Sequence, residues 1–257
     1  MKVSMILTTF NCAENLKITL QSIEEQDYPD IEVVIKDGRS EDETCDIIRS
    51  YEEKSRYAVR WVSERDEGIY DAMNKGFSLS TGDVIAFFND KLCRKDAVSR
   101  VVQAIEKKDP LTGRPYDGAH ADLVYMEDGR PVRYWKMGEG TIREGWMPAH
   151  PTMYLRREVY EKYGLYNESY KCSADYEFMV RILKDGKVRL AYIPEILVEM
   201  YYGGTSSGGV RSYLISLKEG HRALKENRVK GSFQIDARRM LRVFFQFCRA
   251  GKAKIDE

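Results

Sequence analysis

Cysteine is sparse in this chain of 257 residues, and its five copies form no recognisable pattern. They stand at positions 12, 45, 93, 172 and 248, without a Cys-x-x-Cys pair. An odd count with such spacing argues against a disulfide framework and against a structural zinc site, and it favours a reducing compartment. Histidine occurs only at 120, 150 and 221, too rarely for a histidine-rich metal cage.

Long hydrophobic runs and a net charge are also missing. No run of about 18 apolar residues occurs, so no membrane-spanning helix is predicted. The apolar start is interrupted at Asn11, too early for a signal peptide, and a cytoplasmic location is expected. The formal net charge is zero, which disfavours a globally basic nucleic-acid binder. Hydrophobic residues still reach 43%, enough for one large α/β domain with a short extension.

The first ninety residues alternate between two hydrophobic periods. Three apolar runs have the length and composition of strands, at residues 3–7, 31–35 and 83–88, and residues 59–63 alternate like a further strand. Three segments between them repeat apolar side chains at helical spacing: residues 16–23, 41–51 and 69–79. Ser40 is the expected N-cap of the second helix. Apolar strands alternating with amphipathic helices predict a mostly parallel sheet that is covered on both faces.

The remainder of the chain is less regular. A helix is expected at 97–105, and loops around short antiparallel strands are expected from 109 to 145, with one strand near 123–126. Later segments predict, in order, a strand at 152–155, helices at 158–163 and 174–184, strands at 188–193 and 196–201, a flexible glycine- and serine-rich loop at 203–209, and helices at 210–227 and 233–248.

Two acids follow predicted strands, at the sheet edge where α/β proteins bind ligands. Asp37 could accept a hydrogen bond from an imide N–H such as that of uracil, or Asp37-Gly38 could be only a turn. Asp90, beside Asn89, is a reasonable ligand for Mg²⁺ or Mn²⁺, which bind few carboxylates and complete their shell with phosphates and water. A solvated or helix-capping Asp90 is the alternative. No glycine-rich phosphate loop follows the first strand, so a nucleotide must be held differently.

Two further candidates lie in the second half of the chain. Asp175 begins a predicted helix, where the helix dipole favours the ionised carboxylate, and such a group can take a proton from an attacking hydroxyl. It could equally be a simple helix cap, as could Ser173. His150 precedes a strand and could contact phosphate, metal or acceptor, or serve the structure alone.

Taken together, these segments resemble the family 2 glycosyltransferases, which have the GT-A fold. The resemblance covers roughly residues 1 to 205, and the order of its motifs makes it specific. The matching stretches are residues 4–11 (SMILTTFN), 34–44 (VIKDGRSEDET), 63–76 (SERDEGIYDAMNKG), 81–90 (TGDVIAFFND), 150–152 (HPT) and 174–177 (ADYE). Residues 66–76 look especially like bacterial polysaccharide-building members.

The resemblance implies a role for each matching residue. Asp37 would recognise the base, most simply uracil, Asp90 would bind the metal, and Asp175 would be the catalytic base of an inverting single displacement. His150 and Glu177 would lie on the acceptor or phosphate side. The positions implied to bind the nucleotide sugar are Thr9, Asn11, Asp37, Asp66, Gly68, Asp71, Lys75 and Asn89.

The acidic motif departs from the family pattern. The family usually has Asn-x-Asp-Asp or Asn-x-Gly-Asp, whereas this chain has Asn89-Asp90-Lys91-Leu92, which looks shortened by one or two residues. Lys91 could replace part of the charge of the metal, or the site could bind metal weakly. Erosion of this motif also favours an alternative function, a non-catalytic binding or scaffold protein on the same fold.

The C-terminal segment is basic and aromatic. Residues 222–254 contain ten Lys or Arg and two acids, and Met240, Phe244 and Phe247 share one face of the last predicted helix. Such a helix could lie on an anionic membrane surface, or it could pack its aromatic face on the catalytic domain or on a second subunit.

The sequence therefore predicts a catalytic domain at 1–209 and a helical extension at 210–257. The nucleotide-binding half would end near residue 108, and 109–209 would form the acceptor side. The expected reaction moves a sugar from a UDP-sugar, or another nucleotide-diphosphate sugar, to the hydroxyl of a saccharide or lipid-linked saccharide, in cell-surface polysaccharide assembly. A homodimer or a peripheral contact with the inner face of the membrane through the C-terminal helices fits this prediction.

Overall fold

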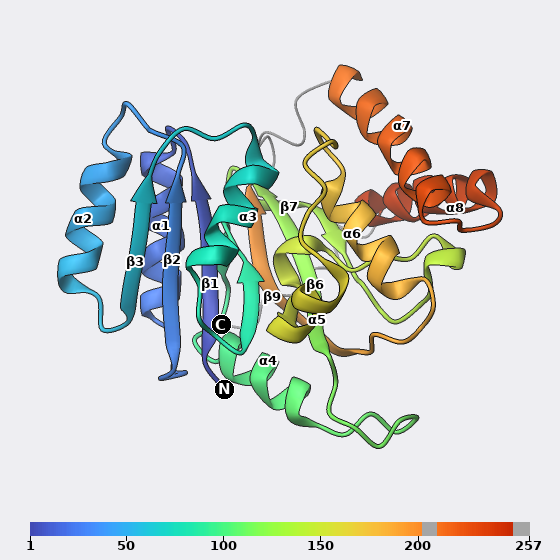
Figure 1. The fold of residues 1–257 in the computed structure, drawn as a ribbon, viewed down its shortest axis with the longest axis horizontal. Helices are drawn as coiled ribbons and strands as arrows, with labels where there is room; N and C mark the ends of the chain where they lie inside the picture. Colours follow the sequence, from blue (N-terminus) through green and yellow to red (C-terminus); the bar gives the residue numbers. More distant parts are fainter. Residues whose placement is uncertain (202–209, 249–257) are drawn as a thin grey trace.

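The computed structural model of the chain describes residues 1–201 and 210–248 (Figure 1). The predicted loop at 203–209 lies outside the described residues. The strands are β1 (Val3–Thr9), β2 (Ile31–Asp37), β3 (Ala58–Ser63), β4 (Val84–Phe87), β5 (Lys91–Leu92), β6 (Gly118–Glu127), β7 (Arg130–Trp135), β8 (Tyr154–Arg156) and β9 (Leu190–Tyr201). The α-helices are α1 (Ala13–Glu24), α2 (Thr44–Lys54), α3 (Ile69–Leu79), α4 (Ala97–Glu106), α5 (Arg157–Tyr163), α6 (Ala174–Leu183), α7 (Val210–Glu226) and α8 (Ser232–Cys248). Two short 3-10 helices, η1 (Ile142–Glu144) and η2 (His150–Thr152), lie between β7 and β8.

The first strands form because both of their faces are buried. Met5 and Leu7 of β1 point into one hydrophobic core, while Ile6 between them points into a second core on the opposite face. In β2, Val33 likewise points into the first core and Val34 points into the second. A strand that is apolar on both faces must be covered twice, which explains the uninterrupted apolar runs in the sequence.

The described strands form one nine-stranded sheet in the order β3-β2-β1-β4-β8-β6-β9-β5, with β7 paired to β6. The pairings β3–β2, β2–β1 and β1–β4 are parallel, as predicted. From β4 onward the sheet is mixed, because β8 runs antiparallel to both of its neighbours while β6 and β9 are parallel. Side chains from α1, α2 and α4 fill one core, and side chains from α3, α5 and α6 fill the other.

Two local expectations differ from the structure. The second helix begins at Thr44, and its N-cap is Glu43 without a side-chain cap bond, so Ser40 is not the N-cap. The two late strands are one strand, β9, which continues past Pro194 through an irregularity. Ala121 pairs with Ile193, and the next residue of β6 pairs with Ile196. Proline lacks a backbone N–H, so it is accommodated at this bulge.

The two C-terminal helices lie beyond α6 and β7, at the right of Figure 1. Ala223 and Leu224 of α7 and Ile235 of α8 join the core that contains α6. Within residues 1–201 and 210–248, no helix combines the length and the apolar character that a membrane crossing requires.

Candidate active site

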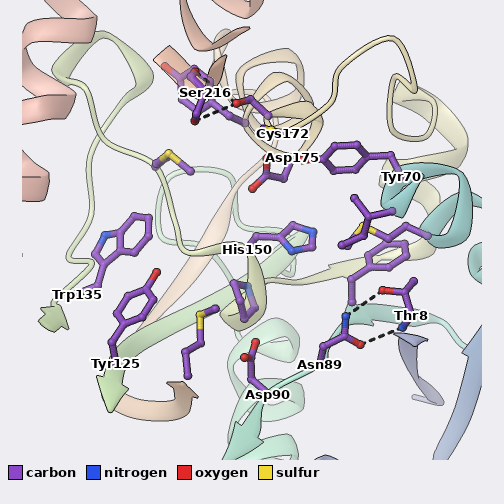
Figure 2. Close-up of a pocket in the computed structure, with 18 of the residues that line it drawn as sticks. Thr8, Tyr70, Asn89, Asp90, Tyr125, Trp135, His150, Cys172, Asp175 and Ser216 are labelled. Carbon is purple, nitrogen blue, oxygen red and sulfur yellow. Dashed lines mark hydrogen bonds between the residues drawn. The ribbon is translucent and has the colours of Figure 1, made fainter. Parts of the chain in front are cut away.

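A cavity of about 1220 Å³ lies at the carboxyl ends of β1 and β4. Its other walls come from the start of α3, from η2, from the start of α6, from the β6–β7 hairpin and from α8. In Figure 2, Asp90 lies below His150 and Asp175 lies above it, with Tyr125 and Trp135 to one side. The predicted site residues that line this cavity are Thr9, Asp66, Gly68, Asn89, Asp90, His150 and Asp175.

Five predicted site residues are not among those that line the cavity: Asn11, Asp37, Asp71, Lys75 and Glu177. Asp37 and Lys75 contact the lining residues Thr9 and Asp66, and Asn11 and Asp71 support the neighbouring loops. The carboxylate of Glu177 is engaged away from the cavity, because it forms an ion pair with Arg181 at 2.8 Å and accepts a hydrogen bond from Asn227 at 2.9 Å. This network fastens α6 to the end of α7, which is a structural role.

Asp37 is completely buried at the end of β2. Its carboxylate accepts hydrogen bonds from the hydroxyls of Ser40, Ser63 and Thr9 at 2.6, 2.6 and 3.0 Å, and from the backbone N–H of Ser40 at 2.9 Å. Burial opposes ionisation, but these bonds outweigh it and hold the pKa of the Asp37 carboxyl below its ordinary value. A carboxylate has about four lone-pair positions, so this one is already saturated.

Two asparagines fasten the loops at this sheet edge. The side chain of Asn89 accepts from the backbone N–H of Thr8 and donates to the Thr8 hydroxyl, both at 2.9 Å (Figure 2). Asn11, with φ of 46°, accepts from the N–H of Glu41, and its own N–H donates to the Ser40 hydroxyl. These bonds tie the end of β4 and the loop after β2 to the end of β1.

Asp66 is held by a lysine that the sequence interpretation did not single out. Lys36 has no exposed surface, and its ammonium lies 2.6 Å from the Asp66 carboxylate. It also donates to the carbonyls of Asp37 and Glu64 at 2.8 Å. A charged residue within the apolar run of β2 was the signal, because a buried lysine requires a partner.

A second lysine supports the same loop from the first turns of α3. Lys75 pairs with Asp71 at 2.9 Å and lies 3.5 Å from Asp66. The carboxylate of Asp71 also accepts the N–H of Glu67 at 2.9 Å. Gly68, with φ of 143°, provides the backbone turn into α3, and a Cβ there would meet open space. Glycine is therefore needed at position 68 because of the backbone conformation and not because of close packing.

Asp90 differs from these acids because burial is the main influence on the pKa of its carboxyl. Loss of hydration raises the pKa of its carboxyl to about 7. Its neighbour Lys91 pairs with Glu199 at 3.2 Å, and Lys91 and Leu92 form the short strand β5 against β9. The motif after β4 is short because the chain enters this strand directly after Asp90.

Asp175 and His150 lie on the other side of the cavity. The hydroxyl of Tyr70, at the start of α3, donates to a carboxylate oxygen of Asp175 at 3.2 Å. The Nε2 atom of His150 lies 2.7 Å from the hydroxyl of Tyr166. Burial lowers the pKa of His150, and the Asp175 carboxylate acts in the opposite direction. Tyr70 was not selected from the sequence, although it lies within the matched stretch 63–76.

The hairpin and α8 add rings and arginines that the sequence interpretation also missed. The guanidinium of Arg133 stacks over the rings of Tyr125 and Trp135, with centroid distances of 4.6 and 5.3 Å. Arg239 of α8 lies over the ring of Tyr176 at 4.2 Å. All five of these residues line the cavity. The loosely patterned segment 109–145 carried no periodic signal that would have located this wall.

Comparison with known proteins agrees with this geometry. Residues 4–164 match the model of glycosyl transferase family 2, and the chain belongs to that family. It is 29% identical over 212 residues to "PGL/p-HBAD biosynthesis glycosyltransferase" proteins of Mycobacterium bovis and Mycobacterium tuberculosis, covering 79% of this chain and 78% of those proteins. The fold is the GT-A fold, with a mixed sheet between helices.

Two solved structures illustrate the shared fold. S. aureus TarS 1-349 in complex with UDP-GlcNAc superimposes with a TM-score of 0.69 at 20% identity, covering 95% of this chain and 73% of that one. The mannosyltransferase PcManGT from Pyrobaculum calidifontis, in complex with GDP-Man and Mn²⁺, gives 0.61 at 16% identity, covering 98% and 76%.

Proposed function

We propose that this chain transfers a sugar from a UDP-sugar to an acceptor hydroxyl, with inversion at the anomeric carbon and with help from a divalent cation. The observation that carries the proposal is the meeting of Asp66, Asp90 and Asp175 in one cavity, although they come from three distant segments. Residues 1–209 would form the catalytic domain, and residues 210–257 would form an extension whose helix α8 completes a cavity wall.

The nucleotide would bind over the ends of β1 and β2. Thr9, Asp66 and Gly68 line this part of the cavity, and Asp37 lies directly behind Thr9. Direct recognition of uracil by Asp37 requires at least one of its present hydrogen bonds to open. The TarS structure with UDP-GlcNAc supports uridine, and the PcManGT structure with GDP-Man shows that the same fold also accepts guanosine.

A divalent cation fits beside Asp90. No group of three metal-binding side chains occurs among the described residues, so protein ligands alone would not hold the ion. One carboxylate and the two phosphates of the donor form a suitable set for Mg²⁺ or Mn²⁺. When bound, the ion would neutralise charge on the diphosphate leaving group. The desolvated carboxylate of Asp90 gains a counter-charge in this arrangement, which explains how its burial is tolerated.

Asp175 would act as the base. As the acceptor oxygen bonds to the anomeric carbon, its proton passes to the Asp175 carboxylate, and the bond to the diphosphate breaks on the opposite face with its electrons. The Tyr70 hydroxyl orients this carboxylate through its 3.2 Å hydrogen bond. His150 is held in the neutral form by burial, so it would line the acceptor path without adding charge.

The acceptor would enter from the wall formed by the hairpin and α8. Tyr125 and Trp135 line the cavity with rings that also stack on Arg133, and a sugar ring could pack on their remaining surface, while Arg242 offers positive charge. A saccharide that carries a phosphate, such as a lipid-linked intermediate of cell-surface polysaccharide assembly, suits this combination.

Calorimetric titration with UDP, with and without Mn²⁺, tests the donor and the cation together. Binding that strengthens with Mn²⁺ supports the proposal. A UDP affinity that is the same with and without Mn²⁺ contradicts the metal-assisted mechanism. No binding of UDP or GDP would favour the alternative of a non-catalytic scaffold with an eroded metal motif. Turnover is then measured with a panel of nucleotide sugars, and release of UDP that depends on an added acceptor identifies transfer.

A further inference from the structure

The outward face of α8 is apolar. Phe233 is 78% exposed, Phe244 is 63% exposed and Leu241 is 59% exposed. Three more large apolar side chains on the same helix are also exposed, namely Met240, Phe245 and Phe247. A contiguous apolar surface of this kind on a folded domain usually marks an interaction site.

The apolar side of α8 faces away from the protein, which is the opposite of its orientation in an ordinary surface helix. With about 3.6 residues per turn, the six exposed apolar side chains occupy an arc of about 160°. The opposite side of the helix carries Ile235, Arg239 and Gln246, which are buried or half-buried and face the protein. Core-facing helices of soluble proteins normally place their apolar stripe inward.

The orientation of α8 is fixed by its inward contacts. Arg238 donates to the carbonyl of Arg143 at 2.8 Å, and Arg242 donates to the carbonyl of Glu144 at 3.2 Å. The backbone of α8 at Arg239 would lie 2.7 Å from a Cβ added at Gly145, so glycine is needed there for close approach. The helix therefore cannot roll to hide its aromatic face without breaking these contacts.

The charges around this face favour an anionic partner. Arg238 lies at one edge of the apolar arc and Arg242 lies just beyond it. Both are exposed and donate to backbone carbonyls, and the nearby Glu144 carboxylate, whose pKa they help to lower, balances only part of their combined charge. The one acid of α8, Asp236, bonds to His221 at 2.7 Å. Phenylalanine and leucine on one face with arginine at its edge is the composition of helices that lie in the interface of a bilayer.

An antiparallel pairing of α8 with a second copy of the chain suits this surface less well. In an antiparallel two-fold pair, the same edge of both helices would meet. Arg238 and Arg242 would then face their own copies, and like charges that are close together at an interface disfavour such a pair.

We propose that α8 lies in the headgroup region of an anionic lipid bilayer, with Phe233, Leu241 and Phe244 inserted and Arg238 and Arg242 at the lipid phosphates. Met240, Arg242 and Phe245 also line the catalytic cavity. The bilayer would therefore lie directly behind one wall of the cavity, close to any acceptor that is anchored in it. The docking surface itself does not depend on the proposed reaction.

Vesicle flotation of the full chain tests this inference. Vesicles of phosphatidylcholine with phosphatidylglycerol should bind the protein more strongly than phosphatidylcholine alone, and salt should weaken the binding. Phe244→Glu or Leu241→Glu should reduce the partition coefficient by about tenfold or more, because an inserted apolar group is replaced by an anion. Leu111→Glu is the matched control, because Leu111 is 79% exposed on the distant loop between α4 and β6 and should leave binding unchanged.

A variant that gains a signal on binding adds a test whose positive result cannot be caused by loss of folding. Phe244→Trp should show a blue shift of the fluorescence on addition of anionic vesicles, with quenching by brominated lipid chains. Absence of binding to anionic vesicles, or equal binding of the parent chain and Phe244→Glu, would overturn the proposal. So would a dimer in sedimentation equilibrium that Leu241→Glu dissociates while vesicles bind neither protein, since the apolar face would then join two copies.

Discussion

Two groups of side chains around the cavity differ in how much the protein itself engages them. On the donor side, Asp37, Asn89 and Asp66 are each engaged by several hydrogen bonds or ion pairs within the protein. By contrast, Asp90, which directly follows Asn89, is desolvated with no counter-charge lowering its pKa, and Trp135 of the β6–β7 hairpin presents a ring. The first group is already organised, whereas the second group consists of side chains that a ligand would engage.

This contrast assigns different consequences to mutations on the two sides. Changes on the donor side should disturb stability and nucleotide affinity, because each side chain there supports its neighbours. Changes at Asp90 and Asp175, which the protein engages less, should disturb turnover and the response to metal while the fold is retained. The predictions below test this division.

The largest effect is expected at Asp175. Asp175→Asn preserves the shape but removes the base, so kcat should fall by about 10² to 10⁴, the range typical of general base catalysis, while UDP affinity should change little. Steady-state kinetics and UDP titration measure the two quantities. Asp185→Asn, exposed beyond the end of α6, is the control and should retain full turnover. Near-normal turnover of the Asp175 variant would remove the base assignment.

Loss of Lys36 should mainly reduce stability. Lys36→Met leaves the Asp66 carboxylate and two backbone carbonyls without their buried cation, and breaking such a pair typically costs about 3–5 kcal/mol. The free energy of unfolding is measured in urea. Lys17→Met, which removes an exposed pair with Glu14, is the control and should leave the midpoint unchanged. If both variants unfold alike, the donor wall is not held by this buried pair.

Asp37 should affect donor affinity by an intermediate amount. Asp37→Ala removes a charged hydrogen-bond acceptor, worth about 1.5–3 kcal/mol, so UDP should bind roughly ten to a hundred times more weakly. UDP methylated at N3 separates two causes. If Asp37 contacts the base, methylation weakens binding to the parent chain but not to the variant. If Asp37 only positions Thr9 and Ser40, the penalty for methylation persists in the variant.

The smallest effect is expected from pH at Asp90. Because the pKa of Asp90 is raised to about 7, the ionised form that a cation needs is present above this pH and is lost below it. The Mn²⁺-dependent part of UDP affinity should therefore fall about tenfold between pH 8 and pH 6. Asp90→Asn should abolish this dependence. An Mn²⁺ effect that is equally large at both pH values would contradict Asp90 as the ligand.

The fold of the first ninety residues could be predicted because the hydrophobic pattern of each strand and helix is visible within its own stretch of sequence. Strands that are buried on both faces must be apolar throughout, and their ends place acids at one edge whatever the rest of the chain does. The single strand β9 was divided in the prediction because Pro194 normally ends a strand. Only pairing with β6 reveals the bulge at which it is tolerated.

The site was predicted less completely because roles depend on contacts. Asp37-Gly38 looks the same in sequence whether the carboxylate faces a ligand or is surrounded by hydroxyls from Thr9 and Ser63. Lys36 was overlooked because a lysine usually belongs to a solvated surface. The aromatic and basic wall comes from the irregular segment 109–145 and from α8, which only the tertiary fold brings to the cavity.

The short connection around Asp90 has a consequence for ligand binding. Only residues 88–90 separate β4 from β5, and both strands are hydrogen-bonded into the sheet. The backbone that carries this carboxylate is therefore ordered before any ligand arrives. The entropy of ordering this connection is lost during folding instead of during association, so a cation that bound to Asp90 as proposed would not have to bear that cost.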